Sequence, residues 1–205
     1  MVQTLQAKNI TLRNLIDRFG IQLVDDRQFF HEWQSHLPEV TESEKQQLDK
    51  VRQGFLNLLN YPPLLEDVVR MSILDPILFI GGFYLQPFYV RSEKSIEIAV
   101  ADRDVIITGS LDALVLREEF WILVIESKKV SFSVEEGLAQ LLTYMLASRH
   151  PEHPSFGMIT SGGSFLFVKL VHATPPQYAT SRLFGTRSLD DLCDVLSILK
   201  RLSNL

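Results

Sequence analysis

The chain of 205 residues contains a single cysteine, Cys193, and this scarcity excludes two common sources of stability. One cysteine cannot form an internal disulfide, and it cannot supply the several thiolates of a cysteine-rich zinc site. Because Cys193 lies within the apolar segment LDDLCDVLSIL, we expect it to pack in the core. A chain without internal disulfides suits the reducing cytoplasm, which is the location that we predict.

Long apolar runs and an excess of positive charge are also missing. No stretch approaches the roughly eighteen apolar residues of a membrane span, and MVQTLQAKNITLRNL lacks the apolar region of a leader peptide. The 25 acidic residues outnumber the 20 lysines and arginines, so the formal net charge is −5. This total argues against a general coat of polyanion but is compatible with a local basic groove. We therefore expect a soluble globular protein without a membrane partner.

The first part of the chain carries helical signals. Thr11 precedes LRNLIDRF, and Thr41 precedes ESEKQQLDKVRQGFLNLL, whose apolar residues recur at helical spacing. The sequence YPP then interrupts this pattern, and LLEDVVRMSILDPIL offers a short helix after it. We predict a helical N-terminal extension over residues 1–60 and a second domain over residues 61–205.

Strand patterns dominate the second domain. The segments SIEIAVA, DVIITGSLDALVL and FWILVIESKKV predict a three-stranded meander, and FGMIT and FLFVKLV predict two later strands. Ser133 with Glu136 forms a capping box for the helix between these groups, and Ser188 with Asp191 opens the last helix. Residues 173–187 read as a loop. The order of elements predicts an α/β fold with a mixed central sheet flanked by helices.

Charged residues gather where the apolar run FWILVI ends. The run lacks alternation, as expected for a central strand covered on both faces, and Glu126 and Lys128 follow it at the spacing of one strand face. A meander places Asp112 on the antiparallel neighbour, roughly opposite Ile125 or Glu126. Two adjacent carboxylates repel each other unless a cation holds them, and oxygen ligands favour Mg²⁺ or Mn²⁺. A lysine beside such a metal can hold or deprotonate a water, as metal-assisted phosphodiester hydrolysis requires.

This spacing carries a family resemblance. Asp112, thirteen further residues and then Glu126-Ser127-Lys128, within this order of elements, resemble the PD-(D/E)xK nuclease superfamily. The resemblance covers residues 64–172 and implies a restriction-endonuclease-like core with the order αβββαβ. In that superfamily the two acids bind Mg²⁺ and the lysine positions the attacking water. The catalytic residues implied here are Asp112 and Glu126 as metal ligands and Lys128 as the catalytic lysine.

Two further elements extend the resemblance. Many members carry an acid on the helix before the sheet, and Glu66 fits that place as a metal ligand, as in the N-terminal nuclease region of type I restriction R subunits. Gln140 and Tyr144 stand one helical turn apart and resemble the Gln-x-x-x-Tyr element of RecB-like nucleases, which helps to bind DNA. One departure is Leu111, which replaces the proline of the superfamily's name but takes no ligand's place. The chain also resembles small restriction-endonuclease-like proteins of cyanobacteria.

The resemblance implies a Mg²⁺-dependent deoxyribonuclease linked to restriction or DNA repair, and we favour an endonuclease over an exonuclease. DNA is the expected substrate, and a homodimer or separate restriction or repair subunits are compatible partners. The sequence has no Gly-Lys-Ser/Thr loop, so any ATP-driven translocation must come from another chain. The alternative is a catalytically inactive DNA-binding or protein-interaction module of the same fold.

Each candidate residue also has a purely structural interpretation. A carboxylate at a strand end more often makes an ion pair than binds a metal, Tyr144 can be a core residue, and Glu66 can lie on an exposed helical face. His150 and His153 have a spacing found in metal sites, but Pro151 denies them a shared helical face, so we expect a surface loop. It is the joint occurrence of the other elements in the right order that favours a nuclease site.

Overall fold

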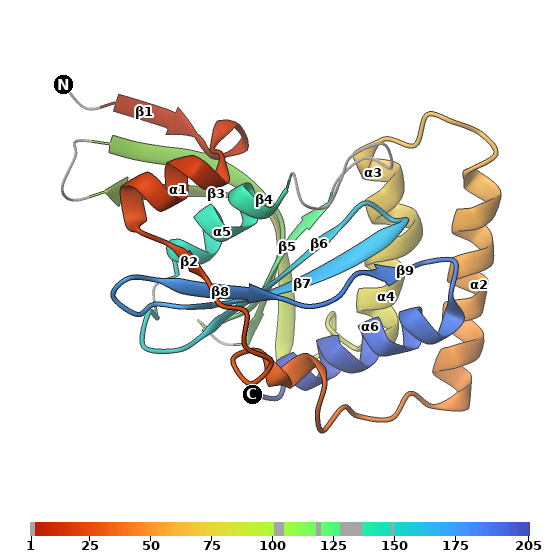
Figure 1. The fold of residues 1–205 in the computed structure, drawn as a ribbon. Coiled ribbons are helices and arrows are strands. Elements are labelled where there is room, and N and C mark those ends of the chain that lie inside the picture. The colour runs from red at the N-terminus through yellow and green to blue at the C-terminus, as the bar shows by residue number, and fades with distance from the viewer. Residues whose placement is uncertain (1–2, 101–104, 118–119, 128–136, 149) are drawn as a thin grey trace.

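The computed structural model of the chain describes residues 3–100, 105–117, 120–127, 137–148 and 150–205 (Figure 1). These residues form a mixed α/β fold, as the sequence predicts, with one nine-stranded sheet and helices on both of its faces. The sheet is mixed because it contains both parallel and antiparallel neighbours. None of the described helices combines the length and the apolar composition of a membrane span.

The elements have the following bounds. The strands are β1 (Gln3–Gln6), β2 (Gln22–Leu23), β3 (Phe88–Val100), β4 (Val105–Arg117), β5 (Phe120–Ser127), β6 (Ser155–Thr160), β7 (Ser164–Val171), β8 (Gln177–Thr180) and β9 (Phe184–Gly185). The α-helices are α1 (Leu12–Phe19), α2 (Glu42–Leu58), α3 (Glu66–Val69), α4 (Asp75–Ile80), α5 (Leu138–Leu146) and α6 (Leu189–Leu202). The 3₁₀-helices η1 (Ala7–Asn9) and η2 (His31–Trp33) are single turns, and the π-helical turn η3 (Arg70–Leu74) joins α3 to α4.

Pairing within the sheet includes the predicted meander and extends well beyond it. The order of strands is β1–β4–β5–β6–β7–β8–β2, while β3 pairs with β4 and β9 pairs with β7. β3, β4 and β5 are antiparallel neighbours, and β6 and β7 form the predicted hairpin. β5 and β6 are parallel, and α5 supplies the crossover that parallel strands require. Counting α3–η3–α4 as one helical segment, the elements from α3 to β6 follow the predicted order αβββαβ.

Three helices begin at the predicted capping residues. The hydroxyls of Thr11 and Thr41 each accept a hydrogen bond from the backbone N–H three residues later, and both complete a capping box. Ser188 accepts in the same way from the N–H of Asp191. Each hydroxyl satisfies one of the backbone N–H groups that a helix start leaves without an intrahelical acceptor. The capping box predicted at residues 133–136 lies outside the described residues.

The N-terminal segment is not purely helical, in contrast to the prediction for residues 1–60. β1 pairs with β4 and β2 pairs with β8, both in parallel, so these strands belong to the main sheet. They contain only four and two residues, which is too short for a local pattern to identify. Their extended conformation depends on the neighbouring strands rather than on their own composition. The division of the chain at residue 60 stays a prediction.

The segment from 173 to 187, predicted as a loop, contains two further short strands. β8 pairs with the second half of β7, and β9 pairs with its first two residues. Residues 181–183 separate the two strands, so β7 has two successive partners on one edge. The sequence predicted β7 itself, but β8 and β9 contain only four and two residues, which is too short for a local pattern to identify.

Apolar residues form two clusters, one on each face of the sheet. Strand alternation divides β4 between them: Ala113 and Val115 are buried with residues of α2, α4 and α6, whereas Leu114 and Leu116 are buried with residues of α1 and α5. Figure 1 shows these two groups of helices on opposite sides of the sheet. Cys193, expected in the core, is only half-buried at the margin of the first cluster.

A buried ion pair connects the N-terminal segment to the sheet. Lys169 of β7 donates hydrogen bonds to the carboxylate of Glu32 in η2 and, at 2.8 Å, to the carbonyl oxygen of Phe29. Both side chains of the ion pair are only 9% exposed. The imidazole Nδ1 of His31 lies 3.8 Å from the other oxygen of Glu32. Because an isolated charge is costly to bury, each member of the pair depends on the other staying in place.

We expect Lys169→Ala to lower the free energy of unfolding by about 3–5 kcal/mol, because it leaves the Glu32 carboxylate buried without its cation. The double variant Glu32→Leu/Lys169→Met removes both charges and should lose less stability. Urea denaturation with an unchanged m value measures both effects. Arg13→Ala, which breaks the exposed Arg13–Asp17 pair, is the control and should cost at most about 0.5 kcal/mol. Equal losses of stability in Lys169→Ala and in the control would show that the buried ion pair does not stabilise the fold as expected.

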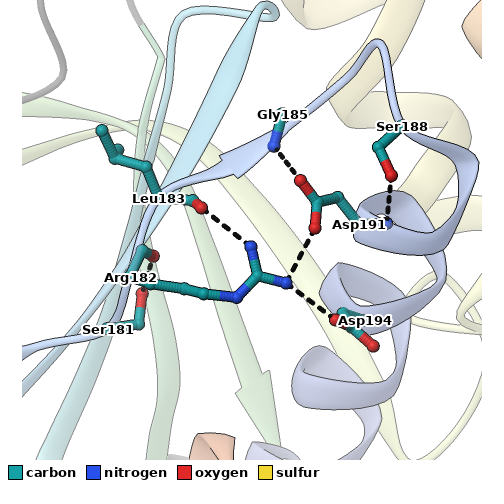
Figure 2. A network of polar contacts seen from close by, with 7 residues as sticks. All are labelled: Ser181, Arg182, Leu183, Gly185, Ser188, Asp191 and Asp194. Carbon is teal, nitrogen blue, oxygen red and sulfur yellow. Dashed lines mark hydrogen bonds and ion pairs between the residues drawn. The ribbon is translucent and has the colours of Figure 1, made fainter.

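A second polar network joins the segment between β8 and β9 to α6 (Figure 2). The Nη2 atom of Arg182 lies 2.7 Å from Oδ1 of Asp191 and 2.9 Å from Oδ2 of Asp194. Its Nη1 donates to the carbonyl oxygen of Leu183 at 3.0 Å. The other oxygen of Asp191 accepts from the N–H of Gly185 at 2.8 Å. One arginine thus holds the loop against the first two turns of the helix.

This network predicts a pH-dependent contribution to stability. Burial raises the pKa of Asp191. The hydrogen bonds from Arg182 and the Gly185 N–H, with the charge of Arg182, together lower the pKa by more than burial raises it, so it lies below its ordinary value of 3.8. A lowered pKa in the folded state stabilises the fold above the unfolded pKa, and this contribution is lost as the pH falls through the folded pKa.

We therefore expect Asp191→Asn to be less stable than the wild type by a constant amount from about pH 7 to pH 5, and the difference to shrink below about pH 4. Urea denaturation across this range measures the difference. Asp190→Asn, at the exposed neighbouring position, is the matched control and should change stability much less. A stability difference between Asp191→Asn and the wild type that persists in full at about pH 2.5 would contradict the lowered pKa of Asp191.

Candidate functional site

One edge of β4 changes its partner strand near the centre of β4. β3 pairs with β4 along one edge from Val105 to Arg117. On the other edge, the pairs with β1 end at Thr108 and those with β5 begin at Ala113. Because β1 runs parallel to β4 and β5 runs antiparallel, the carboxyl ends of both strands converge on residues 109–112. We call this place the β4 fork.

The predicted acids Asp112 and Glu126 belong to the β4 fork by their backbone positions. Ala113 is opposite Ile125 in the ladder, so Asp112 and Glu126 occupy the next position along the two strands. This register agrees with the spacing that the sequence predicts. The side chains of both acids, and Lys128 as a whole, lie outside the described part of the structure. The carboxylate pair, its metal and the catalytic lysine therefore stay predictions.

Helix α5 holds the predicted Gln140 and Tyr144 together over the β4 fork. The amide Nε2 of Gln140 donates to the hydroxyl of Tyr144 at 2.8 Å. Tyr144 is 1% exposed, whereas Gln140 is half-buried. A Cβ atom added to Gly109 of β4 would lie 2.8 Å from the Tyr144 hydroxyl oxygen. The phenol thus reaches the backbone of β4 at the first residue of the fork.

Two small residues permit this close approach. The added Cβ at Gly109 would also lie 2.7 Å from the Cβ of Ala7, which follows β1 and is 1% exposed. A side chain at position 109 would therefore displace Ala7 or the ring of Tyr144. Nearby, Gln6 Nε2 donates to Thr108 Oγ1 at 2.9 Å and holds the end of β1 against β4. In the sequence, the isolated glycine in DVIITGSL is the signal that could have indicated this close approach, since a glycine inside a strand often marks a close contact.

Helix α3 lies at the end of the sheet where β5 and β6 finish. Ser127 is opposite Thr160, and both are the last residues of their strands. In the turn that follows β6, a Cβ added to Gly162 would lie 3.1 Å from Val69 of α3. Glu66, the predicted third acid, is the first residue of α3 and is exposed. It is therefore at the same end of the sheet as Glu126.

The histidines near residue 150 lie in a surface turn, as predicted. His150 Nδ1 is 3.1 Å and His153 Nε2 is 3.9 Å from the same oxygen of Glu152. Within the part of the chain that the structure describes, no group of three or more histidine, cysteine, aspartate or glutamate residues is arranged to hold a metal ion. The side chains of Asp112 and Glu126 fall outside that part.

At the β4 fork the backbones of two acidic residues occupy neighbouring positions on adjacent strands, and the Tyr144 hydroxyl lies close to the first residue of the fork. These groups come from β4, β5 and α5, where the carboxyl ends of β1 and β5 converge. A scan against protein-family models and a search of curated proteins find no match to the chain.

Proposed function

We propose that the chain is a metal-dependent nuclease that hydrolyses DNA phosphodiester bonds at the β4 fork. The observation that carries this proposal is the register of β4 and β5, which sets the backbones of Asp112 and Glu126 side by side where β1 and β5 end. The Gln140–Tyr144 pair over the same place supports it independently of the acids. The element order from α3 to β6 is consistent with a restriction-endonuclease-like core.

The donor set of the proposed site suits a hard divalent cation. Asp112 and Glu126, with Glu66 as a third ligand, offer only carboxylate oxygens, which favour Mg²⁺ or Mn²⁺ over Zn²⁺. When bound, such an ion neutralises charge on the scissile phosphate and lowers the pKa of a bound water. Lys128 would orient that water for attack on phosphorus, in line with the leaving oxygen. A lysine also places a positive charge beside the negative charge that develops in the transition state.

The Gln140–Tyr144 pair would position the DNA strand. The Tyr144 hydroxyl oxygen accepts the hydrogen bond from Gln140 and so fixes the position of the glutamine side chain. Tyr144 itself is 1% exposed, whereas Gln140 is half-buried, so Gln140 is the member of the pair that we propose contacts the DNA. Such contacts orient the substrate, and orientation contributes strongly to catalysis.

The alternative function is a catalytically inactive module that binds DNA or another protein. The burial of Tyr144, which is 1% exposed, favours this alternative because the ring then serves the core of the α5 face. The exposure of Glu66 at the start of a helix favours it as well, since acids commonly stabilise helix starts. In this case the acids at the β4 fork form structural ion pairs.

We expect Asp112→Asn, Glu126→Gln and Lys128→Ala each to lower Mg²⁺-dependent DNA cleavage by at least about 100-fold, because each removes a group that stabilises the transition state. Cleavage of supercoiled and of single-stranded DNA with Mg²⁺ or Mn²⁺ measures the effect and separates endonuclease from exonuclease action. Lys129→Ala, one residue beyond the catalytic lysine, is the matched control. Cleavage that is insensitive to both Asp112→Asn and Lys128→Ala would sink the proposal.

Thermal unfolding with and without Mg²⁺ separates the two functions. An ion that binds only the native state at 100 times its Kd stabilises it by about 2.7 kcal/mol. The nuclease proposal therefore expects Mg²⁺ to raise the Tm of the wild type and to leave Asp112→Asn unchanged. A wild type that neither cleaves DNA nor gains stability from the ion is the result expected of the inactive module.

Tyr144→Phe should raise the KM for DNA by about 10-fold with a smaller effect on kcat, because Gln140 loses the hydroxyl oxygen that positions its side chain for the substrate. Steady-state cleavage of a labelled oligonucleotide measures both constants. Tyr178→Phe is the matched control, since Tyr178 is equally buried at 3% exposure but belongs to β8. An unchanged KM in Tyr144→Phe, or an equal rise in the control, would argue against the proposed contact.

A further inference from the structure

The N-terminal segment formed by β1, η1 and α1 is locally basic, although the chain as a whole is acidic. Residues 1–20 contain Lys8, Arg13 and Arg18 but only one acid, Asp17. Asp17 is paired with Arg13 of the preceding helical turn, at 2.9 Å between Oδ1 and Nη2. A local excess of cations can attract a polyanion even to a chain whose net charge is −5.

This basic segment adjoins the β4 fork through η1. Ala7, the first residue of η1, meets Gly109 of β4, where a built Cβ would lie 2.7 Å from the Cβ of Ala7. η1 also packs against α5, the helix that carries Gln140 and Tyr144. Figure 1 shows β1, α1 and α5 grouped together at the upper left of the molecule. Lys8 follows Ala7 directly, so the backbone places it beside the fork.

Lys8 is exposed, although the turn that carries it is anchored at both ends. Ala7 before it is 1% exposed and Ile10 after it is 7% exposed, and both belong to the apolar cluster that includes α5. The N–H of Ile10 donates to the carbonyl oxygen of Ala7 at 3.1 Å and closes the turn. Lys8 and Asn9 lie between these anchors and are exposed. Because the backbone is already fixed, binding of a ligand needs to order only the lysine side chain.

Few charged residues accompany Lys8 on the β1 side of the fork. Among aspartate, glutamate, lysine and arginine residues, β1, η1, α5 and residues 105–111 of β4 contain Lys8 alone. The next charged residue along β4 is Asp112, three positions beyond Gly109 and so about 10 Å further along the strand. Phosphates of one DNA strand are about 3.4 Å apart along the duplex axis. A duplex whose scissile phosphate lies at the proposed acids therefore brings another phosphate near Lys8.

We propose that Lys8 binds a backbone phosphate of the DNA, a few nucleotides from the phosphate that is cleaved. This inference rests on the proposed function and adds a second point at which the substrate is held. The lysine ammonium group can donate three hydrogen bonds, and it offsets the charge of a phosphate without reading the bases. The contact therefore contributes affinity and fixes the position of the strand, but it gives no sequence specificity.

DNA binding at several salt concentrations tests the contact. Fluorescence anisotropy of a labelled duplex gives the Kd, and the parent protein carries Asp112→Asn so that the duplex is not cleaved during the measurement. We expect Lys8→Ala to raise the Kd by about 5-fold near 0.1 M salt. It should also reduce the slope of log K against log salt concentration by about 0.9, because one phosphate contact fewer releases fewer counterions. Lys8→Arg should keep the slope of the parent, since the charge is retained.

The matched control is Lys50→Ala, which removes an exposed lysine from α2 on the other face of the sheet and should change neither quantity. Thermal unfolding establishes that each variant is folded. Equal Kd values and slopes in Lys8→Ala, Lys50→Ala and the parent, or a parent that binds no DNA, would overturn the contact. A wild type that does not cleave DNA, while binding by the parent depends on Lys8 as expected, would instead refute the nuclease and support the contact.

Discussion

The hydrogen-bond ladder along β4 is the constraint on which the candidate site depends. Any strand has two edges, and β3 occupies one of them along the whole of β4. β1 and β5 must therefore share the other edge, entering it from opposite ends. The fork at residues 109–112 is the necessary result. Backbone pairing, rather than a loop, thus places Asp112 and Glu126, and positions set by a ladder vary less than positions in loops.

The helices on the two faces of the sheet serve different purposes. On one face, α5 supplies the crossover between β5 and β6 and at the same time holds Tyr144 against the fork. On the other face, α2, α4 and α6 cover the larger apolar cluster. The proposed site thus draws on α5 on one face, while the helices of the other face mainly cover the core.

Local signals in the sequence predicted the elements whose partners are near in the chain. At Thr41, for example, the capping hydroxyl and the carboxylate that completes the box lie within one turn. The short strands β1, β2, β8 and β9 escaped prediction because each contains only two to four residues and owes its extended conformation to a neighbouring strand. At the site, the spacing of Asp112 and Glu126 predicted their adjacent positions in the ladder. Only the tertiary structure reveals that Ala7 and Gly109 meet beneath α5.

The parallel pairing of β1 with β4 also has a consequence for the order of folding. Gln6 is hydrogen-bonded to Thr108, 102 residues later, so β1 leaves the ribosome long before its partner strand exists. Contacts of such long range form slowly, because a large loop must close before they gain any stability. One wall of the fork is thus completed only after β4 and α5 have been synthesised. Maturation of the site is therefore a late event, separate from the early formation of helices such as α2.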